Sequence, residues 1–532
     1  MRLSPFDVAS AGLTSGGSVA LAAVVSRCSA KPKRLVALAA ALSMGMGVHG
    51  QPVSGARTLS VQPYAAISQT FSDNIRQTGV DPVSDGLTRL TAGVSLRGQT
   101  GRVRGTLDYS LSSLVYARHS DLNTFQNSLN AVLGGELIEG RVRLDVTGNI
   151  AQSAISAYGV QPGASSGVQS NSTEVRSLRI TPSFLGPLGP DLRYAGQLGY
   201  AVSSARATAL GNSTDTSAGL HIEPTRRGQV SWGLDGSVLR TDYKAGRTTS
   251  DDRLYGSATL NLPDWDVRLQ GNAGLEFSDI TAANRQRYTT WGVGLTWVPS
   301  TRTKLSADYG HRFYGPSHSF AFEHRTALTV WRASSSRSVS TTGDQNASGS
   351  RGTAYDLLYA QFATAVPDPA ARAIYVSNFL KSYGIEPLAT PGFLRSSVTL
   401  QDRQELSAAM RGARSAAVLS LIQTLTQRLG AASGAADDLA NAAEVRQRGF
   451  TLDLSHRLAP ESTLSLLLTH TRGSGTGSGV SQSSQQRRAS LQYRTRPTQH
   501  SDLTLGLRRG LYDNLPIGFD ESAIFATYGL RF

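Results

Sequence analysis

Strict alternation of apolar and polar residues is the feature of this sequence that most limits its possible folds. Across residues 265–277 every second residue is apolar or glycine, and the residues between them are mainly polar; residues 141–150 repeat the pattern. A period of two residues is typical of a β-strand with one apolar and one polar face. The runs last about 10–14 residues, which exceeds the ~5–6 of ordinary strands and approaches the ~9–11 that a tilted strand needs to cross lipid.

The connections between these runs alternate in length. One set is tight: 98–101, 139–140, 185–190, 226–228, 263–264, 299–300, 460–461 and 497–500. The other set is longer and rich in Ser, Asn and Gly: 73–85, 152–172, 206–213, 279–285, 430–445 and 474–484. Short periplasmic turns and long outer loops are typical of outer-membrane barrels. We therefore predict an all-β fold, a transmembrane antiparallel β-barrel over residues 58–532 with about 22 strands, in a range of roughly 18–24.

The N-terminus predicts export. A basic region, Arg27–Arg34, precedes the apolar run Leu35–Val48, and small residues then stand at the −3 and −1 positions of a signal-peptidase site that ends at Gly50. A single anchor helix is the alternative, but the run falls short of the ~20 residues that a bilayer requires. We expect residues 1–50 to be a leader with a cleaved signal peptide and residues 51–57 a short periplasmic segment. The expected location is the outer membrane of a Gram-negative bacterium.

The net charge and the cysteine content fit an exported protein of the outer membrane. The chain has 52 Lys and Arg against 38 Asp and Glu, and its one cysteine, Cys28, lies in the leader. A mature chain without thiols fits passage through an oxidising periplasm, and Arg27 before Cys28 argues against a lipoprotein. Because the chain is expected in the outer membrane, we predict that the excess of basic residues does not serve to bind nucleic acid.

The last strand resembles an assembly signal. Tyr528, Leu530 and Phe532 share one face of a terminal strand that ends in an aromatic residue. We expect these three to be read by the bacterial barrel-assembly machinery, and the outward faces to contact outer-membrane lipid. Tryptophans near the inferred periplasmic turns fit an interfacial girdle, with randomly placed aromatics as the alternative. These are Trp232, Trp265 and Trp297.

Residues 340–390 break the alternation. Ser and Gly dominate their first part, and two short helical stretches follow, one over Tyr355–Phe362 and one that begins at Pro369 with Asp368 as N-cap. We predict a small helical, extracellular insert that caps or partly plugs the outer opening and gates it; the alternative is a mobile loop that only shields the rim. The candidate cap residues are Leu357, Leu358, Phe362, Tyr375 and Phe379.

The polar faces of the strands predict a basic lumen. If apolar positions face lipid, ten basic residues point inward: Arg102, Arg104, Arg141, Arg143, Arg193, Arg268, Lys304, Arg312, Arg494 and Arg508. Such a lumen favours the passage of anionic solutes. The alternative is a network of interior salt bridges with Asp108, Asp145, Asp266, Glu276 and Asp308.

The sequence gives little sign of catalysis. Gly163–Gly167 matches the Gly-x-Ser-x-Gly pattern but sits in a loop, and Gly473–Gly479 lacks the lysine and helix of a phosphate loop. The nine histidines form no metal-ligand spacing. His311, His318 and His324 lie near the inferred outer rim and are interpreted as ordinary polar residues. We expect no enzyme activity, no cofactor and no metal.

Several short motifs, in their order along the chain, resemble a known family. They are Phe71–Asn74, Leu107–Leu111, Tyr116–Asp121, Tyr309–Gly315, Pro367–Arg372 and Phe393–Leu394. Over about residues 58–532 the chain resembles the PEP-CTERM-system-associated outer-membrane protein family, which has no established catalytic residues. The resemblance implies a link with exosortase and exopolysaccharide gene clusters, and hence a conduit or scaffold in the export of extracellular polysaccharide. Anionic polysaccharide and polysaccharide-export proteins would then be partners.

Two other functions stay open at this point. A general diffusion porin would need a constricting loop folded into an open lumen. A rim-located outer-membrane hydrolase would need a close Asp–His or Ser–His pair at the barrel rim.

Overall fold

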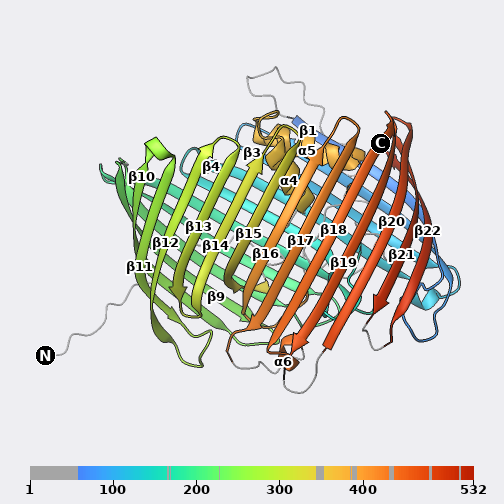
Figure 1. The fold of residues 1–532 in the computed structure, drawn as a ribbon, viewed down its shortest axis with the longest axis horizontal. Helices are drawn as coiled ribbons and strands as arrows, with labels where there is room; N and C mark the ends of the chain where they lie inside the picture. The colour runs from blue at the N-terminus through green and yellow to red at the C-terminus, as the bar shows by residue number, and fades with distance from the viewer. Residues whose placement is uncertain are drawn as a thin grey trace, which may run out of the picture. The chain divides into compact units, whose positions relative to one another are not determined.

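In the described residues, 22 antiparallel strands form one closed sheet (Figure 1). The computed structural model describes residues 58–163, 167, 169–226, 228–342, 353–383, 385, 392–430, 437–477, 482–513 and 517–532, so the leader and the segment 51–57 lie outside it. Each strand pairs with the next in sequence. The last strand pairs with the first, with Tyr64 opposite Arg531 and Ser72 opposite Ala523. The predicted all-β antiparallel barrel is confirmed, with the predicted strand number.

The first half of the barrel wall comprises β1 (Thr58–Ser72), β2 (Asp85–Gln99), β3 (Val103–Tyr116), β4 (Thr124–Ile138), β5 (Val142–Ala154), β6 (Ser172–Leu188), β7 (Leu192–Ala205), β8 (Ser213–Pro224), β9 (Val230–Tyr243), β10 (Thr249–Leu262) and β11 (Val267–Ser278). The second half comprises β12 (Gln286–Ser300), β13 (Thr303–Arg312), β14 (Gly315–Arg325), β15 (Thr329–Ser340), β16 (Thr399–Arg411), β17 (Ser415–Arg428), β18 (Glu444–Ala459), β19 (Ser462–Thr476), β20 (Gln482–Thr498), β21 (Ser501–Asp513) and β22 (Phe519–Arg531). The helices are η2 (Ser120–Leu122), η3 (Pro263–Trp265), α4 (Thr353–Gln361), α5 (Pro369–Tyr383) and α6 (Asp438–Asn441). No helix in the described part of the chain is long and apolar enough to cross a membrane.

The two ends of the barrel differ in their connections. At one end, here called the turn end, each even-numbered strand joins the next through a short turn; the chain terminus is also here, where Phe532 N donates to Pro63 O at 3.0 Å. The opposite loop end carries the longer connections, including that of α6 (Figure 1). In the predicted orientation the turn end faces the periplasm.

The exterior of the barrel is apolar. On β15 the outward Trp331 is 47% exposed, whereas the preceding Val330 is fully buried on the inner side. On β11 the outward Leu269 is 40% exposed, whereas Glu276 is fully buried inside. A closed sheet with its large apolar side chains outside is the architecture of an outer-membrane barrel, because lipid offers no partner to an open sheet edge.

Exposed tryptophans gather near the turn end. Trp232, Trp297 and Trp331 lie within a few residues of short turns on the outward face, where a bilayer interface favours indole rings. Trp265 is a correction to the expected strand. It belongs to the η3 turn, is 72% exposed, and the strand begins only at Val267. A solvent-exposed turn residue continued the alternation by chance.

Candidate functional site

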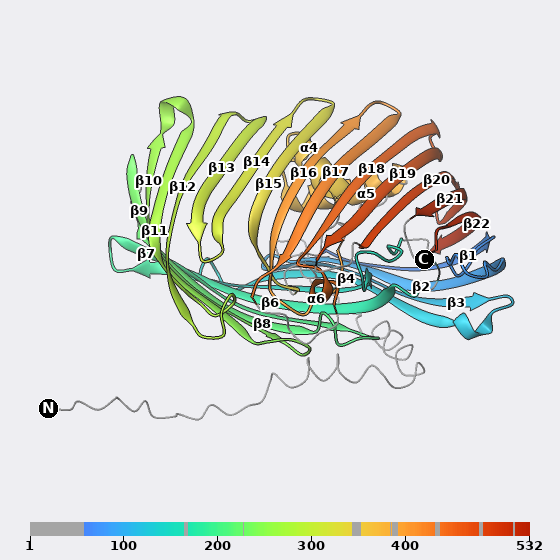
Figure 2. The same cartoon turned by 60° about the horizontal axis from the view of Figure 1, so that its bottom comes forward.

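The helical insert lies inside the barrel, far from where it leaves the wall. It departs after Ser340 and returns before Thr399, which are register partners at the loop end. Its first helix nevertheless packs on Val330, Ala409 and Val418, which lie next to the short turns of β15, β16 and β17. Figure 2 shows α4 and α5 beside β15–β19. The insert therefore reaches the turn end, not the outer opening where it was expected.

The inner surface of the wall explains this position. Val330, Ala409, Ala416 and Val418 occupy inward positions that are polar on most strands, and all are at most 2% exposed. Covering an apolar inner patch stabilises the folded barrel, by roughly 25 cal/mol per Å² of apolar surface removed from water. The apolar face of α4 covers it.

The five candidate cap residues come together in this one cluster. Leu357 and Leu358 are fully buried and Phe362 is 1% exposed. The Phe379 ring lies 5.4 Å from the Phe362 ring, between ring centroids. Tyr375 is 45% exposed, but its ring meets Phe362 edge-on with 4.7 Å between centroids.

Three arginines at the turn end contact the insert through two cation–π interactions and one hydrogen bond. The Arg411 guanidinium carbon lies 4.8 Å from the centre of the Phe362 ring, and that of Arg457 lies 4.7 Å from the centre of the Tyr383 ring. Arg325 Nη1 donates to Ala360 O at 2.9 Å. Each cation–π contact contributes about 0.5–2 kcal/mol, more when water is excluded. No local pattern in the sequence distinguishes these three arginines; the inward apolar positions beside them were the available signal.

Hydrogen bonds also hold the ends of the two helices in place. Asp368 Oδ2 accepts a hydrogen bond from Ala371 N at 2.7 Å, which confirms the predicted N-cap of α5. At the start of α4, Thr353 Oγ1 donates to Glu405 Oε1 on β16 at 3.3 Å. Ser455 Oγ of β18 donates to Tyr383 O at 2.5 Å at the end of α5.

Most of the ten candidate basic residues are neutralised by carboxylates. Arg102 pairs with Glu139 at 3.1 Å, Arg143 with Asp145 at 2.8 Å, Arg193 with Glu223, Arg312 with Asp251 at 3.1 Å and also with Glu276, Arg494 with Asp502 at 3.1 Å, and Arg508 with Glu521 at 2.6 Å. The expected alternative, an interior network of salt bridges, therefore describes much of the wall. Of the expected acidic partners, Asp145 and Glu276 belong to it, whereas Asp266 lies in the η3 turn region.

The basic candidates without a carboxylate partner share one location. Within the described residues, Arg104, Arg141, Arg268 and Lys304 form no ion pair. Three of them are second residues of strands that begin at the turn end, and Arg141 lies in the turn before β5. Of the paired candidates, Arg312 and Arg508 lie toward the loop end, whereas Arg102, Arg143, Arg193 and Arg494 also lie near the turn end. The uncompensated positive charge of this set is concentrated at the expected periplasmic mouth.

The loop end holds a packed layer of its own. Ala157, Phe393 and Leu439, from three separate loops, form a buried cluster. Asp438 of α6 accepts hydrogen bonds from Ser156 Oγ at 2.9 Å and Ala157 N at 2.6 Å. Burial raises the pKa of the Asp438 carboxyl, and burial followed by the charge of Asp438 raises the pKa of Tyr158 to about 12.

Histidine pairs occur, but none completes a catalytic constellation in the described residues. His119 Nδ1 lies 2.8 Å from Asp85 Oδ2 at the loop end, where the same carboxylate also accepts from the His119 backbone at 3.1 Å. That carboxylate orders its own loop. His318 Nε2 lies 3.0 Å from Ser335 Oγ, and no carboxylate in the described part of the chain is bonded to this histidine. No described group of three His, Cys, Asp or Glu could hold a metal ion.

Several solved barrels resemble this fold. The FrpB iron transporter of Neisseria meningitidis (F5-1 variant) is 10% identical with a TM-score of 0.44, over 88% of this chain and 82% of that chain. BauA, the ferric preacinetobactin receptor of Acinetobacter baumannii, is 10% identical with a TM-score of 0.42, over 88% and 80%. A mutant of the ferric enterobactin receptor PfeA of Pseudomonas aeruginosa is 10% identical with a TM-score of 0.40, over 89% and 80%. No family model and no curated protein matches the chain, so its resemblance to the PEP-CTERM-associated family stays a prediction.

Proposed function

We propose that the barrel is a non-enzymatic conduit for an anionic extracellular polysaccharide that enters at the turn end. The observation that supports this most is the location of the uncompensated basic residues Arg104, Arg141, Arg268 and Lys304 at that mouth. Such charge raises the local concentration of a polyanion and lowers the barrier to its entry. Beyond the mouth, the candidates Arg312 and Arg508 are paired with carboxylates and hold the cargo less tightly, as release requires.

The insert acts as the gate in this proposal. Its helices occupy the lumen beside the same mouth, and they are attached through side-chain contacts with Arg325, Arg411 and Arg457. These contacts are individually weak enough to be exchanged for contacts with an anionic polymer, which competes for the same guanidinium groups. The cargo itself would thus favour the open position of the insert.

The resemblance to the PEP-CTERM-associated family supports extracellular polysaccharide as the cargo. Polysaccharide-export proteins would deliver it at the periplasmic end. Insertion of the barrel would use the assembly machinery acting on the terminal residues Tyr528, Leu530 and Phe532. The first two lie on β22, the strand that closes the sheet, and Phe532 follows it directly.

Planar-bilayer recording tests the proposed cargo class. The barrel lacking residues 345–388 is exposed on one side at a time to polygalacturonate, an anionic polysaccharide, or to neutral dextran. We expect polygalacturonate to interrupt the current from the turn end more often than from the loop end, and dextran to have little effect. Replacing Arg104, Arg141, Arg268 and Lys304 by Gln should abolish the difference between the polymers.

A matched control keeps the mouth charge. Arg102→Gln with Glu139→Gln removes an exposed ion pair, whose side chains are 62% and 79% accessible, without changing the net charge. This variant should behave as the parent does. Equal interruption by both polymers in the parent barrel would overturn the proposal.

A general diffusion porin is the second candidate, and one observation favours it. The insert folds into the lumen, as a constricting loop would. A porin would conduct small ions steadily with the insert in place and would interact with neither polymer. The same recordings on the full chain therefore separate the two functions.

A further inference from the structure

The outer wall carries a row of arginines that faces away from the lumen. Arg448 of β18 shares the outward phase of Leu454, which is 39% exposed, and Arg487 of β20 shares that of Leu491, which is 40% exposed. Arg472 of β19 shares that of Leu464, which is 36% exposed. All three arginines are themselves exposed and lie toward the loop end of their strands. They lie at the boundary between the apolar belt and the loop end of the barrel.

Strand register places these arginines side by side. Arg448 is directly opposite Arg472, and Arg487 is directly opposite His470, two residues along the strand from Arg472. Arg509 of β21 continues the row, since it is opposite Ala489, two residues from Arg487. Directly opposed residues lie about 4.5–5.5 Å apart and diagonal ones about 7–8 Å apart. One anionic group can therefore reach two or more of these guanidinium groups at once.

The positive charge of the row is poorly compensated. Arg448 Nε donates to the neutral amide oxygen of Gln423 at 2.8 Å. In the described part of the chain, Arg448, Arg472 and Arg487 form no ion pair; Arg509 alone in the row pairs, with Asp520. Like charges directly opposite each other destabilise a sheet. An external anion at this position would remove that cost.

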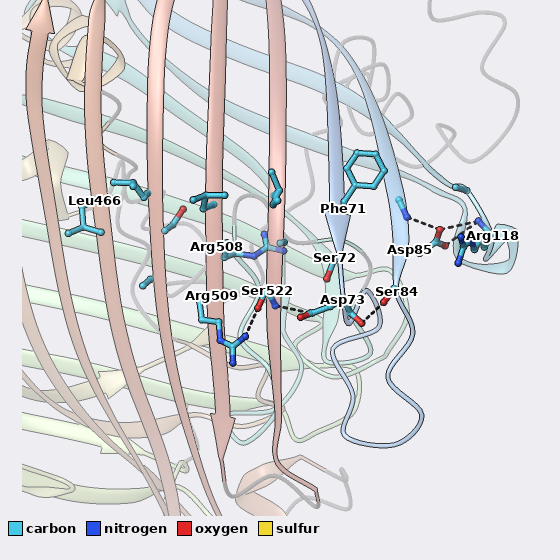
Figure 3. A pocket seen from close by; sticks show the side chains of 18 residues that line it. Phe71, Ser72, Asp73, Ser84, Asp85, Arg118, Leu466, Arg508, Arg509 and Ser522 are labelled. Carbon is cyan, nitrogen blue, oxygen red and sulfur yellow. Dashed lines mark hydrogen bonds between the residues drawn. The ribbon is translucent and has the colours of Figure 1, made fainter.

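A groove lies on the same outer face next to Arg509, the last arginine of the row. Figure 3 shows the residues that line it. It has a volume of about 730 Å³. Leu466, Leu491, Leu507, Ile524 and Phe71 form its apolar part. Arg509, Asp73, Ser84 and Ser522 form its polar part nearer the loop end. The site thus combines an apolar wall with a cationic rim at its outer edge.

We propose that this row and groove bind a phosphorylated lipid of the outer leaflet. A phosphate group would accept hydrogen bonds from Arg448, Arg472 and Arg487, because guanidinium forks match phosphate oxygens in geometry and charge. An acyl chain would lie along the apolar part of the groove. A soluble protein partner fits less well, because Leu491 and Leu507 beside the row belong to the exterior belt that contacts lipid. The proposal concerns the outer wall and does not depend on the cargo of the lumen.

Native mass spectrometry with defined lipids tests this site. The full chain in detergent is mixed with lipid A carrying two phosphates, one phosphate or none. We expect retention of the bisphosphorylated form, weaker retention of the monophosphorylated form, and loss of the phosphate-free form. Arg448→Gln with Arg472→Gln and Arg487→Gln should weaken retention of the bisphosphorylated lipid by about tenfold or more, since several charge-assisted hydrogen bonds are lost.

Two controls separate binding from folding and from plain charge. The corresponding Lys variants keep the charge and should retain most of the lipid. Arg240→Gln with Arg285→Gln and Arg287→Gln makes the same charge change at the loop ends of other strands and should bind like the unchanged chain. Heat-modifiable migration identifies the folded variants. Unchanged retention in the folded Gln variant would overturn the proposal, and so would full displacement of the lipid by millimolar inorganic phosphate.

Discussion

Arg508 of β21 donates a 2.6 Å hydrogen bond to Glu521 of the neighbouring β22, and the two side chains are 3% and 2% accessible. The Glu521 carboxylate also accepts from Ser72 Oγ of β1 at 3.0 Å and from Gln77 Nε2 at 2.6 Å. One buried carboxylate therefore joins the last two strands to the first. It lies where the sheet closes, so its loss should weaken the seam of the barrel.

We predict that Glu521→Gln destabilises the folded barrel by about 3–5 kcal/mol, because it removes the carboxylate charge that pairs with the buried Arg508 guanidinium. Urea unfolding in detergent measures the free energy. Asp520→Asn is the control. It removes an exposed ion pair, in which the Arg509 side chain is 54% and the Asp520 side chain 58% accessible. It should change the free energy of unfolding by only about 0–1 kcal/mol. Equal effects of the two substitutions would refute a structural role for the seam.

We predict that Arg411→Ala and Arg457→Ala loosen the insert. Each removes a guanidinium that stacks on a ring of the insert, at about 0.5–2 kcal/mol per contact. In planar bilayers the double variant should open more often than the parent. Arg414→Ala, in the turn between β16 and β17, is the control and should leave the opening frequency unchanged. If the opening frequency and the conductance of the double variant equal those of the parent, these contacts do not keep the insert in its closed position.

We predict a depth-dependent effect of charge on the outer face of β5. Val146→Arg, in the lipid-facing phase, should destabilise the barrel by about 2–4 kcal/mol if it lies near the bilayer midplane. Val142→Arg, at the first residue of the strand, should cost only ~0–1 kcal/mol near the interface. Asn149→Arg, which faces the lumen, should be tolerated. Urea unfolding of the three variants measures the order, and a reversed order would show that the inside and outside faces are exchanged.

We predict that the loop layer around α6 is more stable in mild acid than at neutral pH. The pKa of Asp438 is raised by burial, so the folded layer binds a proton more readily than the open one. Its stability then falls as pH rises through the interval between the ordinary aspartate value of 3.8 and the raised value. Hydrogen exchange of the Ala157 amide, corrected for its intrinsic pH dependence, measures this. Asp438→Asn should remove the pH dependence; an unchanged profile would exclude Asp438 as its source.

The strands were predictable because their signals are local. Alternation and turn residues lie within a few positions of each other, and the loop over 279–285 has the predicted bounds. The exception, Trp265, shows that an exposed turn residue can mimic one more strand position. The strand number followed from counting alternate short and long connections. Because the number is even, Thr58 at the start of β1 and Arg531 at the end of β22 lie at the same end of the sheet.

The position of the insert and the pairing of charges were not predictable in the same way. The helices themselves follow from local pattern, but their depth depends on an inner patch assembled from Val330, Ala409 and Val418 of three strands. Likewise, Arg312 of β13 meets Asp251 of β10 across 61 positions of sequence. Such contacts depend on the register and curvature of the closed sheet. The basic residues could be assigned to the inner face, but not divided into paired and unpaired.

Deletion of residues 345–388 tests the central claim most directly, which is that the insert obstructs the lumen of a complete barrel. Ser340 and Thr399 are already register partners, so the residues left on either side can bridge β15 and β16 without disturbing the sheet. Single-channel conductance is compared between the full chain and the deletion variant, with heat-modifiable migration as proof of folding. We expect a higher conductance for the deletion variant, because the lumen is then no longer obstructed. An unchanged conductance in a folded, heat-modifiable barrel would contradict it.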